Sequence, residues 1–555
     1  MTLKGYEAIV NVLKMEGTSF VSLFPGTGGT GTEGRIINQL PKADIRPVLS
    51  RNERVAINIA DGYTRVSGKT GVSLISMGVG EENAYSGISQ AYSDMVPMLI
   101  LAGGTPRRRV GSRPTQDFDA LYTYGKITKW VENINYAERV PEVMRRAFTY
   151  LRTGRPGPVY LQIPGDVSNE EFDDSSFRYS PIMGWKAAAN PRDIEVAVRG
   201  ILASTNPLIY AGEGVYYAKA WTELCEFAEL VQAPVMTTLK GKGVFPENHP
   251  LSVGNGGTDG GKAAAHFLRK ADLVFAIGAS LTRRAGAPMP KGRKLIQAVI
   301  DERDLNKDYL ADLAVLGDAQ LVLKQMCDEV KRQTNGEGRP KNKALVEEVR
   351  RVKEEWLKEW MPKLTSNEVP INPYRVIWDL MQTLDRGNTI ITHDSGWPRD
   401  ALAPFWETPV PRGYIGWGHH STMGFSLGVS LGAKLAEPQK TVVQFTGDGS
   451  FGMVGMDWET AVRNKIPILT VVINNGGLGH YYQDTPPTAA LGGDYSKVAQ
   501  ALGGYGERIV NPDEIVPAIK RGLETTKSGR PALLEFMIRL EEDYQDKYWA
   551  DLYRG

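Results

Sequence analysis

Two polar residues, Asp448 and Asn475, follow two apolar runs that are typical of buried parallel strands. Thr441–Phe445 (TVVQF) leads toward Asp448, and Ile468–Ile473 (ILTVVI) leads to Asn475. A helical stretch around Met456–Asn464 lies between the runs. We therefore expect a β-α-β unit whose two strands are parallel and whose carboxyl ends open on one crevice. Carboxylate and amide oxygens at such an edge suit Mg²⁺ that phosphate oxygens also hold.

The residues beside Asp448 add groups that suit a phosphate. Gly447 and Gly449 let a ligand approach the backbone closely, and Ser450 can donate a hydrogen bond. A Gly-Asp-Gly sequence alone is also a good turn, so the alternative is a structural turn that holds no metal. Its combination with Asn474-Asn475 across the crossover favours the metal site.

This GDG and NN pair resembles the diphosphate-binding signature of thiamine-diphosphate-dependent enzymes. The resemblance implies three Mg²⁺ ligands: the side chains of Asp448 and Asn475 and the main-chain carbonyl of Gly477. The metal would bridge the protein to the diphosphate of the cofactor, and Leu478 would contact the cofactor as well.

Two further segments of the last third resemble cofactor contacts of the same family. In Trp417–Gly424 (WGHHSTMG), the resemblance makes Met423 the apolar wedge under the bent cofactor. It makes the Ser421 carbonyl the acceptor for the 4′-amino group. Asp394-Ser395-Gly396 ends another expected strand and would contact the diphosphate.

A carboxylate with a different role is expected in the first third of the chain. Ser50–Ala56 (SRNERVA) resembles the family segment whose glutamate hydrogen-bonds the aminopyrimidine and so activates the cofactor, which implies that role for Glu53. Gly78–Asn83 (GVGEEN) is similar to the family's GPGxxN turn, with Val79 in place of proline, and implies that Asn83 contacts the cofactor. The alternative for Glu53 is a surface residue that a helix dipole stabilises.

Fewer matches bear on the substrate. The resemblance spans essentially the whole chain and is closest to the acetohydroxyacid synthase and oxalyl-CoA decarboxylase branch. Gln116 matches the glutamine that synthases place over the thiazolium ring, whereas Asp484 replaces the tryptophan with which they select a 2-oxo acid acceptor. His480, directly after the metal loop, is the expected acid–base group. A histidine that only shapes the pocket is the alternative.

We therefore expect a transferase or lyase, an acetolactate-synthase-like carboligase or decarboxylase that acts on 2-oxo acids. A 2-hydroxyacyl-CoA lyase or oxalyl-CoA-decarboxylase-like enzyme is the second hypothesis. A non-catalytic, nucleotide-binding paralogue is the remote one. The resemblance also implies a homodimer or homotetramer, because the family places its active site between the pyrimidine domain of one subunit and the diphosphate domain of another.

The middle third of the chain is expected to hold FAD or ADP, as it does in relatives. Arg283, Arg284, Lys291 and Arg293 follow an expected strand and Gly278, and would suit a diphosphate. The alternative is a solvated basic loop in a vestigial site.

The elements that must position these residues are short apolar runs that alternate with helical patterns, which is typical of parallel α/β domains. Three doubly wound parallel-sheet domains are expected: a pyrimidine-binding domain at 1–175, a central, Rossmann-like domain at 190–332 and a diphosphate- and Mg²⁺-binding domain at 365–555. Asp173–Ala187 and Gln333–Lys343 are expected linkers. The tail Asp543–Tyr553 is either a lid over the active-site mouth or an ordinary packing helix.

The composition narrows the class of protein. The chain has 555 residues, with 65 Lys+Arg against 64 Asp+Glu, a net charge of +1 that argues against a nucleic-acid binder. Two cysteines exclude a disulfide framework. The most apolar runs, Met95–Ala102 and Ile466–Ile473, are far shorter than the roughly 20 residues that span a bilayer. Residues 1–16 are an amphipathic helix rather than a signal peptide. We expect a soluble, cytoplasmic protein without membrane or nucleic-acid partners.

Overall fold

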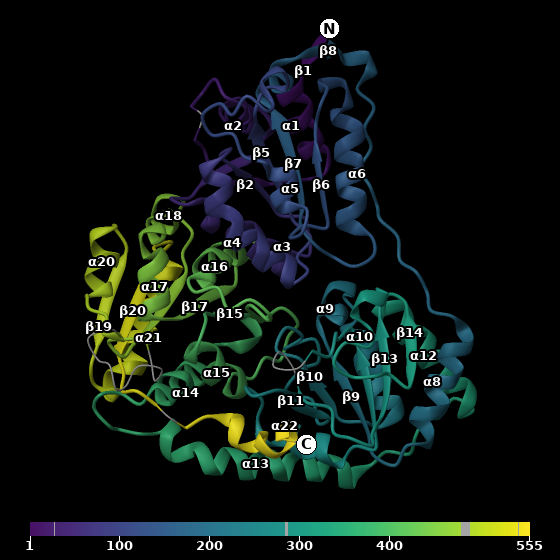
Figure 1. Cartoon of the computed structure of the whole chain (residues 1–555). Helices are drawn as coiled ribbons and strands as arrows, with labels where there is room; N and C mark the ends of the chain where they lie inside the picture. The colour runs from purple at the N-terminus through teal and green to yellow at the C-terminus, as the bar shows by residue number, and fades with distance from the viewer. Residues whose placement is uncertain (27, 283–286, 479–488, 542, 555) are drawn as a thin grey trace.

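The computed structural model describes the chain except for residues 27, 283–286, 479–488, 542 and 555. Three six-stranded sheets, all with parallel neighbours, follow one another along the sequence, and helices cover them (Figure 1). This confirms the predicted fold class of three parallel α/β domains. In the described part of the chain, no helix combines the length and the apolar character that a membrane crossing requires.

The first sheet has the strand order β3-β2-β4-β5-β7-β6. Its strands are β2 (Phe20–Phe24), β3 (Arg46–Leu49), β4 (Val72–Ile75), β5 (Leu99–Gly104), β6 (Trp130–Asn133) and β7 (Val159–Pro164). The helices are α1 (Gly5–Met15), α2 (Thr32–Gln39), α3 (Glu53–Ser67), α4 (Val79–Ser93), α5 (Ala120–Tyr124), α6 (Val140–Arg152) and α7 (Gly165–Asn169). A short antiparallel pair, β1 (Thr2–Lys4) and β8 (Glu171–Asp173), ties the N-terminus to the end of this domain.

The central sheet has the order β11-β10-β9-β12-β13-β14. Its strands are β9 (Pro207–Ala211), β10 (Val235–Thr237), β11 (Ser252–Asn255), β12 (Leu273–Ile277), β13 (Lys294–Val299) and β14 (Leu313–Leu316). The helices are α8 (Pro191–Ala203), α9 (Glu213–Ala218), α10 (Trp221–Val231), α11 (Lys262–Lys270) and α12 (Ala319–Gln333). The strand order reverses direction between β9 and β12, which is where ligands bind in sheets of this type.

The third sheet has the order β16-β15-β17-β18-β20-β19. Its strands are β15 (Thr389–His393), β16 (Tyr414–Ile415), β17 (Thr441–Gly447), β18 (Leu469–Asn474), β19 (Tyr505–Ile509) and β20 (Ala532–Met537). The helices are α14 (Pro373–Thr383), α15 (Trp397–Phe405), α16 (Phe425–Ala436), α17 (Asp448–Val454), α18 (Trp458–Arg463), α20 (Tyr495–Ala501) and α21 (Ile515–Lys527).

A linking helix and the C-terminal tail join the central and third domains. Helix α13 (Lys343–Leu364) runs along the base of the molecule beneath both (Figure 1). The tail, which ends in α22 (Ala550–Arg554), packs beside it. Trp549 is fully buried and donates from Nε1 to the Gly260 carbonyl at 2.7 Å. This part of the tail is therefore a packing segment, although Tyr544 lines the large cavity described below.

The first and third domains meet through a close crossing of α3 and α16. A Cβ atom on Gly432 would lie 2.0 Å from the Ile59 carbonyl oxygen, and one on Gly62 would lie 2.2 Å from that of Val429. These distances are far shorter than any van der Waals contact, so glycine is required where the two backbones touch. The crossing fixes how α3, which begins at Glu53, lies against the third domain.

Gly432→Ala is expected to lower the free energy of unfolding by at least about 2 kcal/mol, because the new methyl group must push α16 away from α3. Gly200→Ala on α8 is the matched control. Its Cβ would be no closer than 3.5 Å to the nearest side chain, so alanine should be neutral or stabilise by up to about 1 kcal/mol. Denaturant unfolding of both variants measures the difference. Equal stability of the two variants would show that the crossing is not tight.

Candidate active site

One cavity of about 900 Å³ at the carboxyl edge of the third sheet gathers most of the residues predicted to bind the cofactor. Strands β15, β17 and β18 lead into it. The predicted residues that line it are Ser395, Gly396, Ser421, Met423, Gly447, Asp448, Gly449, Ser450, Asn475, Gly477 and Leu478. Residues far apart in the sequence therefore line one cavity, as expected for the carboxyl ends of neighbouring parallel strands.

Asp448 and Asn475 stand at neighbouring strand ends. Strands β17 and β18 are parallel, and Gly447 pairs with Ile473 at the last step of their register. The Asp448 side chain is buried, and its Oδ1 accepts a hydrogen bond from the Gly449 amide at 2.9 Å. Its Oδ2 has no hydrogen-bond partner in the described part of the chain. Burial raises the pKa of Asp448 to about 6.

A buried carboxylate oxygen without a donor, on the wall of a cavity, fits a cation. The described residues hold no cluster of three or more histidine, cysteine or acidic side chains that could bind a metal by themselves. Asp448, Asn475 and a carbonyl would therefore supply only part of a coordination sphere. That partial set is the one expected for Mg²⁺ that also takes oxygens from a diphosphate.

Apolar side chains close over the glycine beside Asp448. A Cβ on Gly449 would lie 3.1 Å from Leu478 Cδ2 and 3.2 Å from Met423 Cε. Ser395 and Ser421 join their hydroxyl groups by a hydrogen bond on the cavity wall. The cavity therefore has a polar floor at the strand ends and an apolar ridge above it.

Asp394 acts on this cavity through the backbone rather than by lining it. Its fully buried carboxylate accepts hydrogen bonds from the amides of Ser395 at 2.7 Å, Gly424 at 2.9 Å and Ser426 at 3.1 Å. It thereby holds the Ser395-Gly396 turn against the start of α16.

The predicted residues of the first domain form a second group around the turn that starts at Gly78. Glu53, buried at the start of α3, accepts a hydrogen bond from Asn83 Nδ2 at 3.2 Å. A Cβ on Gly80 would lie 2.7 Å from Glu53 Oε1, and one on Gly78 would lie 2.6 Å from the Gln116 carbonyl oxygen. Glu53, Asn83 and Gln116 are not among the residues that line the large cavity.

The two groups are linked by one side chain. Arg54, next to Glu53, donates from Nη2 to the carbonyl of Met423. One chain therefore contains both groups of predicted residues. One group lines the cavity, the Glu53 group lies outside it, and Arg54 connects the two.

Sequence reasoning missed a glutamate beneath the Gly78 turn. Glu81 is fully buried; its Oε2 accepts from the Gly78 amide at 2.7 Å, and Tyr160 donates to its Oε1. Burial raises the pKa of Glu81 to about 8. Two consecutive glutamates, Glu81-Glu82, are typical of an exposed helix start. Nothing in the local sequence therefore indicated that Glu81 is buried while Glu82 is exposed.

A buried carboxylate where the three domains meet was also missed. Asp94, at the end of α4, has no exposed surface and accepts hydrogen bonds from the amides of Gly418 and His419 at 3.1 Å. Arg65 Nη2 donates to it at 3.1 Å, and Lys240 Nζ lies 3.9 Å away. Burial alone would favour the neutral acid, but Arg65 and Lys240 hold the pKa of Asp94 below its usual range.

The histidines near the cavity are not equivalent. Burial lowers the pKa of His393 to about 3, and the charge of Lys240, together with burial, lowers that of His419 to about 4. Both rings are therefore neutral at physiological pH. His420 faces Ser89 and Ser93, with its ring nitrogens 3.3 and 3.0 Å from their hydroxyls. His480, the predicted acid–base group, and Asp484 lie outside the described residues.

Lys291 and Arg293, the two basic residues predicted for the central domain that the structure describes, do not lie beside Gly278. Lys291 and Arg293 precede the amino end of β13, whereas Gly278 follows the carboxyl end of β12, which runs parallel to β13. Arg293 donates to the Arg269 carbonyl at that amino end. These two residues therefore lie a strand length from Gly278, and Arg283 and Arg284 are outside the described residues.

Comparison with known proteins gives one consistent result. Family models of thiamine pyrophosphate enzymes match the N-terminal TPP binding domain at residues 3–123, the central domain at 194–326 and the C-terminal TPP binding domain at 394–536. A probable acetolactate synthase large subunit of Methanocaldococcus jannaschii is 34% identical, over 97% of this chain and 92% of that protein.

Further relatives carry similar descriptions. The probable acetolactate synthase large subunit of Methanococcus aeolicus is 32% identical over 97% of this chain and 92% of its own length. The acetolactate synthase isozyme 3 large subunit of Escherichia coli (strain K12) is 29% identical over 97% of this chain and 95% of its own length.

Glu81→Gln is expected to flatten the dependence of stability on pH. A glutamate whose pKa rises from 4.5 to about 8 on folding contributes stability that is complete below pH 4.5 and is lost as the pH rises through 8. The free energy of unfolding of the wild type should therefore fall by a few kcal/mol more than that of the variant between pH 5 and about 8.5.

Denaturant unfolding at several pH values measures this difference, and Glu82→Gln, at the exposed neighbour, is the control that should keep the wild-type slope. A wild-type slope in Glu81→Gln would mean that Glu81 is ionised in the folded protein.

Proposed function

The chain belongs to the thiamine pyrophosphate enzyme family, and from that premise we propose that it is a Mg²⁺-dependent, acetolactate-synthase-like carboligase or decarboxylase of 2-oxo acids. The names of its relatives support the reaction class. The observation that carries the proposal is the unpartnered Oδ2 of Asp448, on the wall of a cavity that Asn475 and Met423 also line.

In this proposal the third domain holds the cofactor through the metal. Asp448, Asn475 and the Gly477 carbonyl would hold Mg²⁺, whose charge would offset that of the diphosphate. Thiamine diphosphate supplies, when bound, a nucleophilic carbon and an electron sink for bonds next to a carbonyl group. Small and polar groups accept the diphosphate, namely Ser395, Gly396, Gly447, Gly449 and Ser450. Ser421, Met423 and Leu478 contact its ring systems.

Glu53 is proposed as the residue that activates the cofactor. A buried carboxylate can share a proton with a ring nitrogen of an aminopyrimidine, and Asn83 orients it from 3.2 Å. Gln116, above the same turn, is proposed to face the substrate. His480 is the proposed acid–base group that returns or removes the substrate proton.

The separation of the two groups supports a shared active site. Glu53 does not line the cavity of its own chain, although both halves are present in that chain. We infer a cytoplasmic homodimer or homotetramer in which the pyrimidine domain, 1–175, of one subunit completes the diphosphate domain, 365–555, of another. The central domain, 190–332, then braces both.

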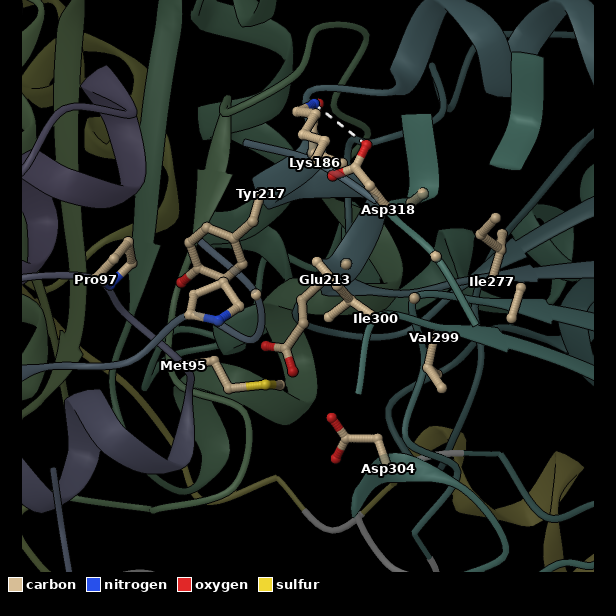
Figure 2. A pocket seen from close by; sticks show the side chains of 18 of the residues that line it. Met95, Pro97, Lys186, Glu213, Tyr217, Ile277, Val299, Ile300, Asp304 and Asp318 are labelled. Atoms are coloured by element: carbon tan, nitrogen blue, oxygen red, sulfur yellow. Dashed lines mark hydrogen bonds and ion pairs between the residues drawn. The ribbon is translucent and has the colours of Figure 1, made fainter. Parts of the chain in front are cut away.

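The central domain has a pocket of its own at the carboxyl edge of its sheet. It is about 280 Å³ in volume, and Met95 and Pro97 of the first domain line it together with Glu213 and Tyr217 of the central domain (Figure 2). Lys186 is paired with Asp318 at 3.3 Å and is not free to bind a phosphate.

This pocket supports a nucleoside-sized ligand better than a full dinucleotide. Its volume is just below the range of typical ligand sites, which span roughly 300–1,000 Å³. Its charged side chains are already paired: Glu213 with Lys240, Asp304 with Arg155 and Lys307, and Asp318 with Lys186. Of the predicted pair we therefore propose ADP, with its adenosine in this pocket, and FAD as the less suited ligand.

Acetolactate should form when the purified protein is incubated with thiamine diphosphate, Mg²⁺ and pyruvate, with mass spectrometry as the assay. Glu53→Gln is expected to lower the rate at least about 100-fold, because it cannot carry the shared proton. Glu82→Gln, at an exposed glutamate of the neighbouring Gly78–Asn83 segment, should keep wild-type activity.

The absence of any product from pyruvate would contradict the proposed substrate class. Asp484, in place of the tryptophan that selects a 2-oxo acid acceptor, then favours the second candidate, a 2-hydroxyacyl-CoA lyase or oxalyl-CoA-decarboxylase-like enzyme. Assays with oxalyl-CoA and a 2-hydroxyacyl-CoA would test it.

A further inference from the structure

The contacts of Lys240 determine which ring nitrogen of His419 carries the proton. Lys240 Nζ lies 2.8 Å from His419 Nδ1. An ammonium group has three donors and no acceptor, so Nδ1 must be the acceptor and therefore carries no hydrogen. In a neutral imidazole the hydrogen is then on Nε2.

Lys240 also contacts two buried acids. Glu213 Oε1 lies 2.5 Å from Nζ, and Asp94 Oδ1 lies 3.9 Å away. The Lys240 side chain is 10% exposed, and those of Glu213 and Asp94 are 8% and 0% exposed. These contacts fix Nζ beside the imidazole, as the donor in its hydrogen bond to His419.

The ring of His419 belongs to the wall of the proposed active-site cavity, and its Nε2 lies beside another residue of that wall. His419 and Thr282 both line that cavity, together with Ser421, Met423 and Asp448. Thr282 Oγ1 lies 3.4 Å from Nε2, at the long end of hydrogen bonding. Among the residues that the structure describes, the Nε2–H group therefore has only this weak partner, and it can donate to a ligand.

The backbone of His419 is fixed as firmly as its ring. Its amide and that of Gly418 donate to Asp94, and a Cβ on Gly418 would lie 2.0 Å from Lys240 Cδ. Glycine at 418 thus lets the lysine pass beside the chain and reach the imidazole.

We propose that His419 is a substrate-recognition residue, whose Nε2–H donates to a carboxylate or carbonyl oxygen of the substrate, and that Lys240 is the positioning residue that fixes its tautomer. The identity of that oxygen rests on the proposed function, whereas the tautomer does not. The low pKa of His419, about 4, agrees with a ring that donates a hydrogen bond without transferring a proton at physiological pH.

The tautomer is measured directly by two-dimensional ¹H–¹⁵N NMR of the full-length protein labelled with ¹⁵N-histidine, using His419→Asn to assign the signal. We expect a neutral His419 with the hydrogen on Nε2 at pH 7. In Lys240→Met, which removes the donor, the two tautomers should become mixed. A hydrogen on Nδ1, or a charged ring at pH 7, in the wild-type protein would overturn the proposal whether or not the variant folds.

Two substitutions test the role in substrate binding. His419→Gln can place an amide N–H near the position of Nε2, whereas His419→Asn can place its Oδ1 acceptor near Nδ1 but is too short to put a donor at the position of Nε2. For the 2-oxo acid that the wild type converts, KM should rise about tenfold in the Asn variant, and kcat should change less than about threefold. The Gln variant should restore KM to within about threefold.

His420→Gln is the matched control, because His420 contacts Ser89 and Ser93 and does not line the cavity. The affinity for thiamine diphosphate, measured by tryptophan fluorescence, should be the same in all variants. Equal KM values in the Asn and Gln variants would contradict the recognition role. If no 2-oxo acid is converted by the wild type, the proposed function fails, and the NMR result still decides the tautomer.

Discussion

The Asp94 carboxylate, buried with no exposed surface where three domains meet, is the constraint on which the proposed site depends. It binds Arg65 of α3, whose other end is Glu53, and the amides of Gly418 and His419, which lead to Ser421 and Met423. Removing one partner of such a buried charge typically costs about 3–5 kcal/mol. The contacts of Asp94 thus help to set the positions of Glu53, Met423 and Lys240 relative to one another.

The close crossing of α3 and α16 at their glycines is a second constraint, in addition to the buried charge of Asp94. Hydrogen bonds to Asp94 fix one end of each element, and the contact of Gly432 with the Ile59 carbonyl sets the distance between the helices. Together they leave little freedom for Arg54, which reaches from the start of α3 to the Met423 carbonyl. The geometry of the site is therefore a property of the packing of whole domains.

The features that could be predicted from the sequence are those that a local pattern of residues determines. Asp448 and Asn475 lie at adjacent strand ends because a β-α-β unit has only one common handedness, and the cavity that joins them to Met423 and Ser395 follows from it. Strand β20 (Ala532–Met537) was not predicted, although it lies inside the sheet and the turn residues Ser528–Pro531 precede it. Pairing with β18 and β19, far away in sequence, determines it.

Lys291 and Arg293 follow Gly278 in sequence, but the intervening chain crosses to the other end of the sheet. Asp94, Glu213 and Lys240 gave no signal because each is an ordinary charged residue until three domains surround it.

If Glu53 activates a thiamine diphosphate that the third domain holds, the C2 proton of the bound cofactor must exchange rapidly for deuterium. The exchange rate is measured by ¹H NMR after rapid acid quench, with Mg²⁺ and no substrate present. We expect exchange at least about 100-fold faster than for free cofactor in the wild type, and a return to nearly the free rate in Glu53→Gln. Exchange that is no faster than in solution, or that is equally fast in Glu53→Gln, would contradict it.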